Sequence, residues 1–449
     1  MSNLIFGISG VRGVVNSSFF PQNSLELGLS FGSFVPPYGG IVVGRDTRRS
    51  GDLILNAFIS GFLSTGNSVL NLGIVPTPTV LLNTHLLGKD GGAIITASHN
   101  PLEWNGVKFN NKKGFFLSEE EVTALYEIYN KKDFNIASWE QVRIMEYDRD
   151  GVKRHIDRIF SLIDVEKIRE RQFKVIFDGC RGALSTPAEK LLSLLGCDVR
   201  IIESNRNPEP VPTNLGEVAD ACGSGDFDIG FASDMDGDRI AVITEKGDIP
   251  GEEYTLALAL SHISGKKKGK VVTNLSTSRM IDDIAGDYLV RTKVGEANVV
   301  KKMMEVGAVF GGEGNGGVIW PDMHPTRDGL SAISIILEYM ADEREPVSKL
   351  IKRLPSYYMV KEKIKAKGDI DIEGLAGLLP EGEIRKEDGI RIDYEDAFIH
   401  IRKSNTEDVI RIICEAKKEE ICKTLIGKAK SWLRGSSGER EKAGKGEKN

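Results

Sequence analysis

Short β-branched runs alternate with longer amphipathic segments along most of the 449-residue chain, and this alternation constrains the fold most. The runs expected to form strands are Gly40–Val43, Gly92–Ile95, Lys174–Phe177, Ile229–Ala232, Lys270–Val272 and Ala308–Phe310. The segments whose apolar residues recur at helical spacing are Asp52–Ser64, Thr186–Leu195, Tyr254–Ile263 and Gly329–Met340. Strands that alternate with helices in this way predict an α/β protein with parallel or mixed sheets.

A loose repeat is visible within this alternation. Three segments each run from a strand through a polar turn into a helix: IVVGRDTRRSG (41–51), KVIFDGCRGALS (174–185) and KVVTNLSTSRMI (270–281). Each is followed by a second strand that ends in a loop of small and charged residues: TASHNP (96–101), SDMDGDR (233–239) and GGEGNGG (311–317). The pattern predicts three similar mixed α/β domains whose loops point into a central cleft.

The pattern also predicts where the domains begin and end. We expect the three α/β domains to occupy 1–147, 148–247 and 248–355. From 356 to 433 the order strand, helix, strand, strand, helix, with turns at Gly368 and Asp388–Gly389, predicts a C-terminal α+β domain. The tail from 434 to 449 has almost no apolar residues and is expected to be disordered.

Composition excludes several classes of protein. Hydrophobic residues make up 40% and charged residues 28%, and the net charge is −6, which disfavours a dedicated nucleic-acid binder. No apolar run is long enough to span a bilayer, and Met1–Arg12 lacks the pattern of a secretory signal. The five cysteines are widely spaced without a CxxC pair, as expected of plain thiols in the cytoplasm.

The loop after the Ile229–Ala232 strand carries three carboxylates, Asp234, Asp236 and Asp238. Oxygen ligands suit Mg²⁺, which keeps positions free for phosphate oxygens. An EF-hand is disfavoured because Arg239 stands where its glycine is required. A haloacid-dehalogenase-type phosphatase has a similar DxDG loop and stays open at this point.

The loop TASHNP presents Ser98 after a strand, with His99 next to it. A helix cap or a turn would also use Ser and Asn. A Ser–His–Asp hydrolase would prefer a GxSxG elbow, which is absent. The magnesium loop favours phosphoryl chemistry at Ser98, because a phosphoserine brings about two negative charges to a metal.

Two further loops have the composition of ligand-binding sites. In GGEGNGG, Glu313 and Asn315 lie on one side of an extended segment and suit sugar hydroxyls. In RKSNTE (402–407), Arg402, with Arg411 after it, accompanies hydroxyl groups at a turn expected to run into a helix, which indicates a phosphate site.

Together these loops resemble those of the α-D-phosphohexomutase family. The resemblance runs from FGISGVRG (6–13) through TASHNP, DMDGDR and GEGNGG to RKSNTE, in family order. It implies four domains around a central cleft, the first three sharing a mixed α/β core. It also reduces the phosphatase and EF-hand interpretations to minor alternatives.

The resemblance assigns roles to residues of this chain. Ser98 is implied to be the phosphorylated nucleophile and a metal ligand through its phosphate, and Asp234, Asp236 and Asp238 the ligands of one Mg²⁺ ion. Arg12, His99, Lys108 and Arg239 match positions around the reacting phosphate. Lys108 is the candidate general acid/base, if Arg12 and Mg²⁺ depress its pKa. The residues implied to bind substrate are Glu313, Asn315, Lys293, Arg327, Arg402, Ser404, Asn405, Thr406 and Arg411.

The activity implied is interconversion of hexose 6-phosphate and hexose 1-phosphate, with a hexose 1,6-bisphosphate as intermediate and activator. The expected partners are sugar phosphates, with no nucleic acid or membrane, and self-association into a homodimer is left open. GEGNGGVI resembles archaeal members, which favours glucosamine 6-phosphate as substrate; broad phosphomannomutase/phosphoglucomutase activity is the alternative. A magnesium-dependent sugar phosphatase and a non-catalytic sugar-phosphate sensor are alternatives of other classes. The phosphate loop departs from the family, because Asp408 stands where proline is common.

Overall fold

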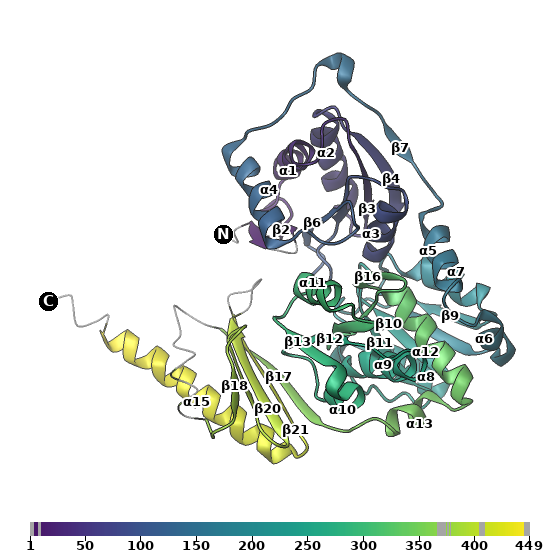
Figure 1. The fold of residues 1–449 in the computed structure, drawn as a ribbon, viewed down its shortest axis with the longest axis vertical. Helices are drawn as coiled ribbons and strands as arrows, with labels where there is room; N and C mark the ends of the chain where they lie inside the picture. The colour runs from purple at the N-terminus through teal and green to yellow at the C-terminus, as the bar shows by residue number, and fades with distance from the viewer. Residues whose placement is uncertain are drawn as a thin grey trace.

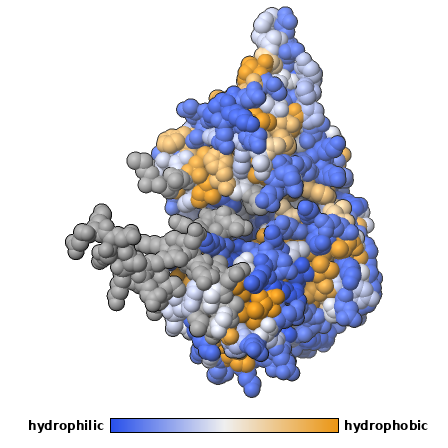
Figure 2. All heavy atoms as spheres, turned by 60° about the vertical axis from the view of Figure 1, so that its left-hand side comes forward, coloured by the Kyte–Doolittle hydropathy of each residue, from blue (hydrophilic) through white to orange (hydrophobic). Residues whose placement is uncertain are grey.

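The computed structural model describes residues 4–7, 10–365, 374, 377, 379–403 and 409–443, with side chains as far as Leu433. The chain forms four domains (Figure 1), an arrangement that confirms the predicted fold class: three mixed α/β domains and a C-terminal α+β domain. No helix in this part of the chain has both the length and the apolar content of a membrane span. Hydrophilic residues cover most of the face in Figure 2, and its apolar side chains form separate patches.

Domain I is built on a seven-stranded sheet with the order β1-β2-β6-β5-β3-β4-β7. Strands β5, β3, β4 and β7 pair in parallel. On the other side of β5, each successive strand is antiparallel to its neighbour: β6 to β5, β2 to β6 and β1 to β2. Its strands are β1 (Ile5–Gly7), β2 (Gly10–Val14), β3 (Gly40–Arg45), β4 (Ser68–Ile74), β5 (Gly91–Ile95), β6 (Trp104–Asn111) and β7 (Met145–Tyr147); its helices are α1 (Pro21–Phe34), α2 (Gly51–Leu63), α3 (Thr77–Leu86) and α4 (Glu119–Lys131).

Domain II has a four-stranded sheet, β11-β10-β8-β9, in which only the β10–β11 pair is antiparallel among the described strands. Its elements are α5 (Gly151–Phe160), α6 (Val165–Arg171), β8 (Lys174–Asp178), α7 (Ser185–Leu194), β9 (Asp198–Ile202), α8 (Gly216–Ser224), β10 (Ile229–Ser233) and β11 (Ile240–Thr244).

Domain III has a five-stranded sheet, β13-β12-β14-β15-β16, which is parallel from β13 to β14 and antiparallel beyond. Its elements are α9 (Glu253–Lys266), β12 (Val271–Asn274), α10 (Met280–Ala285), β13 (Leu289–Thr292), α11 (Glu296–Val306), β14 (Phe310–Glu313), β15 (Gly317–Trp320), β16 (His324–Arg327), α12 (Gly329–Glu343) and α13 (Val347–Lys352).

The predicted helices of the α/β region coincide closely with α2, α7, α9 and α12, but one predicted strand is misplaced. Strand β14 begins only at Phe310, not at Ala308. The amide of Ala308 instead donates to the carbonyl of Met303, 2.9 Å away, because Gly307 adopts a left-handed conformation that closes α11.

Domain IV is an antiparallel sheet in the order β17-β21-β20-β19-β18, followed by a long helix. Its described elements are β17 (Tyr358–Lys365), β18 (Glu383–Arg385), β19 (Ile390–Asp393), β20 (Ala397–Lys403), β21 (Val409–Ala416) and α15 (Glu419–Ala443). Two more strands are present than predicted; the turn expected at Gly368 and most of the segment between β17 and β18, where a helix was expected, lie outside the described residues.

Helix α15 covers the first part of the tail, from 434 onward, that the composition predicts to be disordered. The backbone of α15 continues as helix to Ala443, and only 444–449 lie outside the described residues. The segment lacks apolar residues, but its lysine, arginine and glutamate residues are good helix formers that can extend an existing helix without burial.

The apolar cores divide the molecule differently from the sheets. Domain I and domain IV have cores of their own. Domains II and III share one continuous core, in which Leu191 and Phe231 of domain II and Leu256 and Phe310 of domain III belong to the same cluster as Ile336 of α12. Domains II and III are therefore packed together as one apolar unit.

Equivalent hairpins carry the loops that the sequence singled out. TASHNP joins β5 to β6, SDMDGDR joins β10 to β11, and GGEGNGG joins β14 to β15. In each case the chain leaves a strand that pairs in parallel on one side and returns antiparallel on the other. The three loops thus occupy the same place in three related sheets.

Candidate active site

The hydroxyl of Ser98 lies at the centre of the site. Ser98 is buried and has a left-handed backbone with φ of 51°, which costs a serine about 1 kcal/mol and must be held by its surroundings. Its Oγ donates to Asp234 Oδ2 at 3.0 Å and lies 3.5 Å from His99 Nδ1. The bend after β5 therefore presents the Ser98 hydroxyl to the aspartate loop of domain II.

A buried ion pair that the sequence analysis did not single out supports this bend. Asp46 and Arg48 follow β3, the strand next to β5. Arg48 Nη2 donates to the carbonyl of Ser98 at 2.6 Å, and Arg48 Nε donates to Asp46 Oδ2 at 3.0 Å. GRDTR (44–48) lies in the first of the three repeated strand-to-helix turns, so its position could have drawn attention to it. Its residues alone did not indicate a particular chemistry.

Asp234, Asp236 and Asp238 converge as predicted. One carboxylate oxygen from each lies within 4.8 Å of the others, and all three side chains are buried. Asp236 Oδ1 and Asp238 Oδ1 are buried without a hydrogen-bond partner. Buried carboxylate oxygens need a partner, so the donor set fits a hard divalent cation such as Mg²⁺.

The pKa values of Asp234 and Asp236 shift in opposite directions. Burial and the neighbouring Asp238 and Asp236 raise the pKa of Asp234 well above its usual range. Burial would also raise the pKa of Asp236, but Lys108 and the hydroxyl of Thr77 outweigh it and hold that pKa below its usual range. The Thr77 Oγ1 to Asp236 Oδ2 distance is 2.8 Å, so domain I supplies both stabilising groups.

Lys108 departs from the sequence expectation of a depressed pKa. Its Nζ lies 2.6 Å from Asp236 Oδ2 and 3.4 Å from Asp238 Oδ2. Burial lowers its pKa, but the two carboxylates outweigh burial, so the pKa of Lys108 is raised in this arrangement. Arg327 is a cation that opposes the two carboxylates and lowers the pKa of Lys108.

Arg327 binds three acidic residues from two domains. Its guanidinium lies 2.6 Å from Asp238 Oδ2, 3.2 Å from Glu313 Oε2 and 2.9 Å from Glu296 Oε2. Glu313 is buried and its Oε1 also accepts from Asn274 at 2.8 Å and from the amide of Gly295 at 3.0 Å. Arg327 therefore connects the metal loop to the sugar loop, and Glu296, which sequence reasoning missed, neutralises part of its charge.

The remaining predicted cations of the reacting end gather around the Ser98 loop. Arg12 Nη1 donates to Asn100 Oδ1 at 2.9 Å. Arg239 Nε is buried without a hydrogen-bond partner, 3.7 Å from Asp238 Oδ1. Burial, Arg239 and Arg12 lower the pKa of His99 well below its usual value, which keeps this imidazole neutral at pH 7. The loop is thus surrounded by fixed positive charge.

The predicted anion site lies on adjacent strands of domain IV. Arg402 of β20 stands directly opposite Arg411 of β21. Burial lowers the pKa of Arg402, and Arg411 lowers it further, while Arg402 Nε is buried without a hydrogen-bond partner. Like charges opposite each other repel, and Asp388, whose Oδ1 lies 3.9 Å from Arg402 Nη1, offsets part of this repulsion. The turn that was expected to run into a helix leads instead into strand β21. Ser404, Asn405 and Thr406 lie outside the described residues.

Two predicted substrate contacts lie at the margin of the cluster. Asn315 is half-buried and its Oδ1 accepts from the amide of Gly317 at 3.2 Å within the sugar loop. Lys293 is exposed and lines a small pocket near the start of α11. The Arg411 charge also contributes to lowering the pKa of His99, which places domain IV within electrostatic reach of the Ser98 loop.

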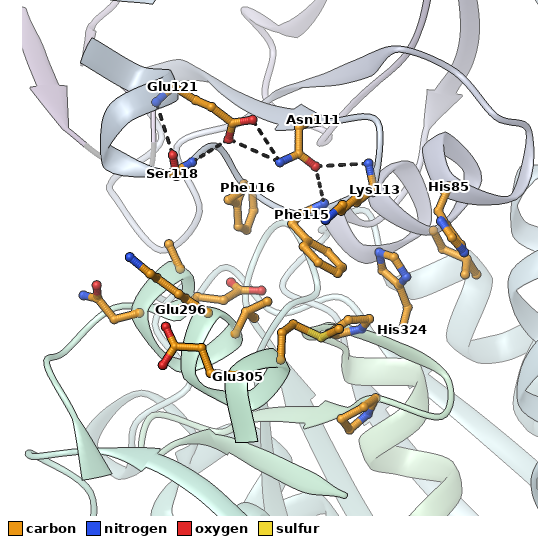
Figure 3. A pocket seen from close by; sticks show the side chains of 18 of the residues that line it. His85, Asn111, Lys113, Phe115, Phe116, Ser118, Glu121, Glu296, Glu305 and His324 are labelled. Atoms are coloured by element: carbon orange, nitrogen blue, oxygen red, sulfur yellow. Dashed lines mark hydrogen bonds between the residues drawn. The ribbon is translucent and has the colours of Figure 1, made fainter. Parts of the chain in front are cut away.

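A separate chamber of about 1100 Å³ lies between domains I and III (Figure 3). Phe115 and Phe116 face it from domain I, and His324 faces it from domain III. Of the acidic residues bound to Arg327, only Glu296 is among the described residues that line this chamber. The reacting groups around Ser98 are not part of its wall.

The comparisons agree with this geometry. Family models described as phosphoglucomutase/phosphomannomutase match domain I at residues 3–136, domain II at 153–247, domain III at 251–358 and the C-terminal domain at 358–426. A phosphoglucomutase/phosphomannomutase of Thermococcus kodakarensis is 38% identical over 93% of this chain and 95% of its own length. A phosphoglucosamine/phosphogalactosamine mutase of Sulfurisphaera tokodaii is 33% identical over 96% of this chain and 99% of its own.

The similarity extends to solved structures. The crystal structure of a phosphoglucomutase/phosphomannomutase family protein from Burkholderia thailandensis superposes with a TM-score of 0.85 at 26% identity, covering 97% of this chain and 98% of that chain. With all four domains matched and the loops in place, the chain belongs to the phosphoglucomutase/phosphomannomutase family of α-D-phosphohexomutases, whose members are intramolecular phosphotransferases.

Proposed function

We propose that this enzyme interconverts hexose 6-phosphates and hexose 1-phosphates through a phosphorylated Ser98, with glucosamine 6-phosphate as its preferred substrate. The observation that carries the mechanism is the Ser98 hydroxyl, 3.0 Å from Asp234 within a buried carboxylate cluster that is short of partners. Phosphoglucosamine mutases among its relatives, at 32–35% identity, support the choice of sugar.

The reaction proceeds in two balanced transfers. In the first, the P–O bond to Ser98 breaks as a sugar hydroxyl forms a new P–O bond and loses its proton, and the released Ser98 Oγ takes up a proton. The resulting bisphosphate turns over in the cleft. Its other phosphoryl group then returns to Ser98 Oγ, which loses its proton, and the oxygen released on the sugar takes up a proton. Arg402 and Arg411 hold the phosphate that is not reacting, in either orientation of the sugar.

The carboxylate cluster and the surrounding cations have different electrostatic roles in the transfer. Asp234, Asp236 and Asp238 are the residues that would hold Mg²⁺, which when bound would supply positive charge near the transferred phosphoryl group. Arg12 and Arg239 neutralise charge at the Ser98 loop. Lys108 is placed to donate the proton that the leaving oxygen takes up, and neutral His99, 3.5 Å from Ser98 Oγ, is a second group able to exchange one.

Broad phosphomannomutase/phosphoglucomutase activity is a second candidate. It is favoured by the phosphoglucomutase/phosphomannomutase of Thermococcus kodakarensis, which at 38% identity is more similar to this chain than the phosphoglucosamine mutases compared above. The two candidates share the Ser98 chemistry and differ only in which groups at the C2 position of the sugar are accepted.

The test is ³¹P NMR of the purified protein with Mg²⁺, a trace of sugar 1,6-bisphosphate and, in parallel, the 6-phosphates of glucosamine, mannose and glucose. A 1-phosphate signal is expected, fastest with glucosamine 6-phosphate. Comparable rates with mannose and glucose would favour the broad activity instead. Release of inorganic phosphate alone would replace the mutase with a phosphatase, and no change with any sugar would favour a sensor.

A further inference from the structure

The turn GRDTR after β3 contains a buried ion pair that the proposed chemistry does not use. Asp46 and Arg48 form the only salt bridge within the described residues in which both side chains are completely buried. An ion pair in such a place is expensive to desolvate, and it persists only where further hydrogen bonds satisfy both partners. The contacts of both groups lead to the Ser98 loop.

The guanidinium of Arg48 uses all five of its N–H donors. Nε donates to Asp46 Oδ2, and the other four donors reach backbone carbonyl oxygens of the loop that contains Ser98. Those carbonyls and their distances are Ser98 at 2.6 Å and Asn100 at 2.7 Å from Nη2, and Pro101 at 2.6 Å and Trp104 at 3.1 Å from Nη1.

Asp46 reaches the same loop by a second route. Its Oδ2 accepts from the hydroxyl of Thr96 at 2.7 Å, and the same hydroxyl accepts from the backbone N–H of Ser98 at 2.9 Å. Its Oδ1 accepts from the amide of Arg48 at 2.9 Å, which fixes the pair itself. Both the N–H and the carbonyl of Ser98 are thereby tied to the Asp46–Arg48 pair.

We propose that Arg48, held by Asp46, is a positioning residue that fixes the left-handed bend at Ser98 and so sets the direction in which the Ser98 hydroxyl meets the aspartate loop. This inference rests on the proposed function, because the effect of Arg48 is measured as a rate of phosphoryl transfer. Its effect falls on the rate of transfer and not on sugar affinity, since Arg48 is buried beneath the loop and its donors are fully used within it.

Arg48→Lys is the sharpest variant, because it keeps the charge and removes the planar array of donors. We expect kcat to fall about 100-fold, the loss typical of a reacting group displaced by about 1 Å, while KM stays within about threefold. Arg49→Lys is the matched control: Arg49 is the next residue, it is exposed, and its replacement leaves both constants unchanged. A kcat of Arg48→Lys within threefold of the wild type overturns the proposal.

Thr96→Val keeps the proposal testable if Arg48→Lys fails to fold. Valine has a similar volume but lacks the hydroxyl, so the link between Asp46 and the Ser98 amide is lost. We expect kcat to fall about tenfold, the effect of one lost hydrogen bond, with KM unchanged. Thr96→Ser restores the hydroxyl and recovers most of the rate. Equal activity of the valine and serine variants would refute the role of this link.

Hydrogen exchange of the intact chain separates this proposal from the proposed function. Amides in peptides covering 96–104 should exchange faster in Arg48→Lys than in the wild type or Arg49→Lys, while peptides of α1 and α2 keep their protection. Unchanged exchange at 96–104 overturns the positioning role whatever the activity. If the wild type turns over no hexose phosphate but the loop loosens selectively, the positioning of Ser98 stands and the proposed substrate falls.

Discussion

The two ends of the cleft are built in opposite ways. At the reacting end, side chains from domains I, II and III meet in short, buried ionic contacts, such as Lys108 with Asp236 and Arg327 with Asp238. At the anchoring end, Arg402 and Arg411 share one sheet of a single domain, and Arg402 has only Asp388, 3.9 Å away, as an ionic partner among the described residues. The reacting end is held by several short ionic contacts between domains, whereas the two arginines of the proposed anchoring end stand opposite each other within one sheet.

This difference matches two different tasks. Phosphoryl transfer requires fixed geometry, so a prearranged cluster contributes directly to the rate. In the proposed reaction the distal phosphate would be bound in two orientations of the sugar, so its site would need charge more than exact placement. Substitutions at the reacting end should therefore change kcat, and substitutions at the anchoring end should change KM.

Ser98→Ala should have the largest effect, because it removes the proposed acceptor of the phosphoryl group. We expect turnover to fall roughly 10⁴-fold or more, with the fold intact. The assay is 1-phosphate formation by ³¹P NMR, with thermal unfolding as the control for structure. A variant that retained even a tenth of the activity would remove Ser98 from the mechanism.

Asp236→Asn keeps the shape of the side chain but removes a charge from the metal site. We expect a loss of about 10²–10³-fold in kcat and a higher Mg²⁺ concentration for half-maximal activity. Asp226→Asn is the control, because Asp226 lies in the same domain with a 92% exposed side chain. An unchanged magnesium titration would contradict the assignment of the metal loop.

Glu415 tests the contact between domain III, which belongs to the reacting end, and domain IV, which contains the anchoring end. It lies in β21 at the contact of domains III and IV, where it accepts from the amide of Arg279 at 2.7 Å. Burial, and to a smaller extent nearby Glu253, raise its pKa to about 7, although Ser278, Arg279 and Arg291 oppose the shift. The folded state therefore binds this proton more tightly than the unfolded state.

Stability should consequently be greater below the unfolded pKa and fall as the pH rises through about 7. The shift from the ordinary value near 4.5 corresponds to about 3 kcal/mol lost over this range. Urea unfolding between pH 4.5 and 8 measures it. Glu415→Gln should flatten the profile, and Glu420→Gln, an exposed change close by, should not. Identical profiles for the wild type and Glu415→Gln would disprove the coupling.

Arg402→Ala should have the smallest effect and the most selective one. Losing a charge-assisted hydrogen bond to phosphate should raise KM about tenfold, while kcat stays within about twofold. Lys428→Ala removes an exposed charge from the same domain and serves as the control. A drop in kcat without a change in KM would place Arg402 among the reacting groups and erase the distinction between the two ends.

Most of the loops of the candidate site could be predicted from the sequence, but the contacts between residues of different loops could not. The three hairpin loops were recognisable because each follows a strand and carries residues with a definite chemistry, Ser98 and Asp236 among them. Arg48 could not be assigned, because the carbonyls that it binds lie 50 or more positions away in a loop whose backbone carries no sequence signal. The carboxylates beside Lys108 were hidden from the sequence for the same reason: they come from domain II, 128 and 130 positions away.

Helix α15 shows a different limit of sequence reasoning. Composition identified the region after Arg434 as unable to form a core, and this inference was extended to disorder. A helix that is already nucleated by buried residues such as Leu425 and Leu433 can continue through charged residues at little cost. Lack of burial and lack of secondary structure are separate properties.

The shared core of domains II and III determines where two members of this family could be joined into a chimaera. A crossover near residue 250 would bring together two halves of one apolar interior that were never selected to fit, and would leave cavities around α12. A crossover near residue 357 would cut between cores and transplant the anchoring end intact. Chimaeras that swap domain IV should fold and inherit the donor's phosphate anchoring, which makes this domain the natural unit for recombining affinity without disturbing chemistry.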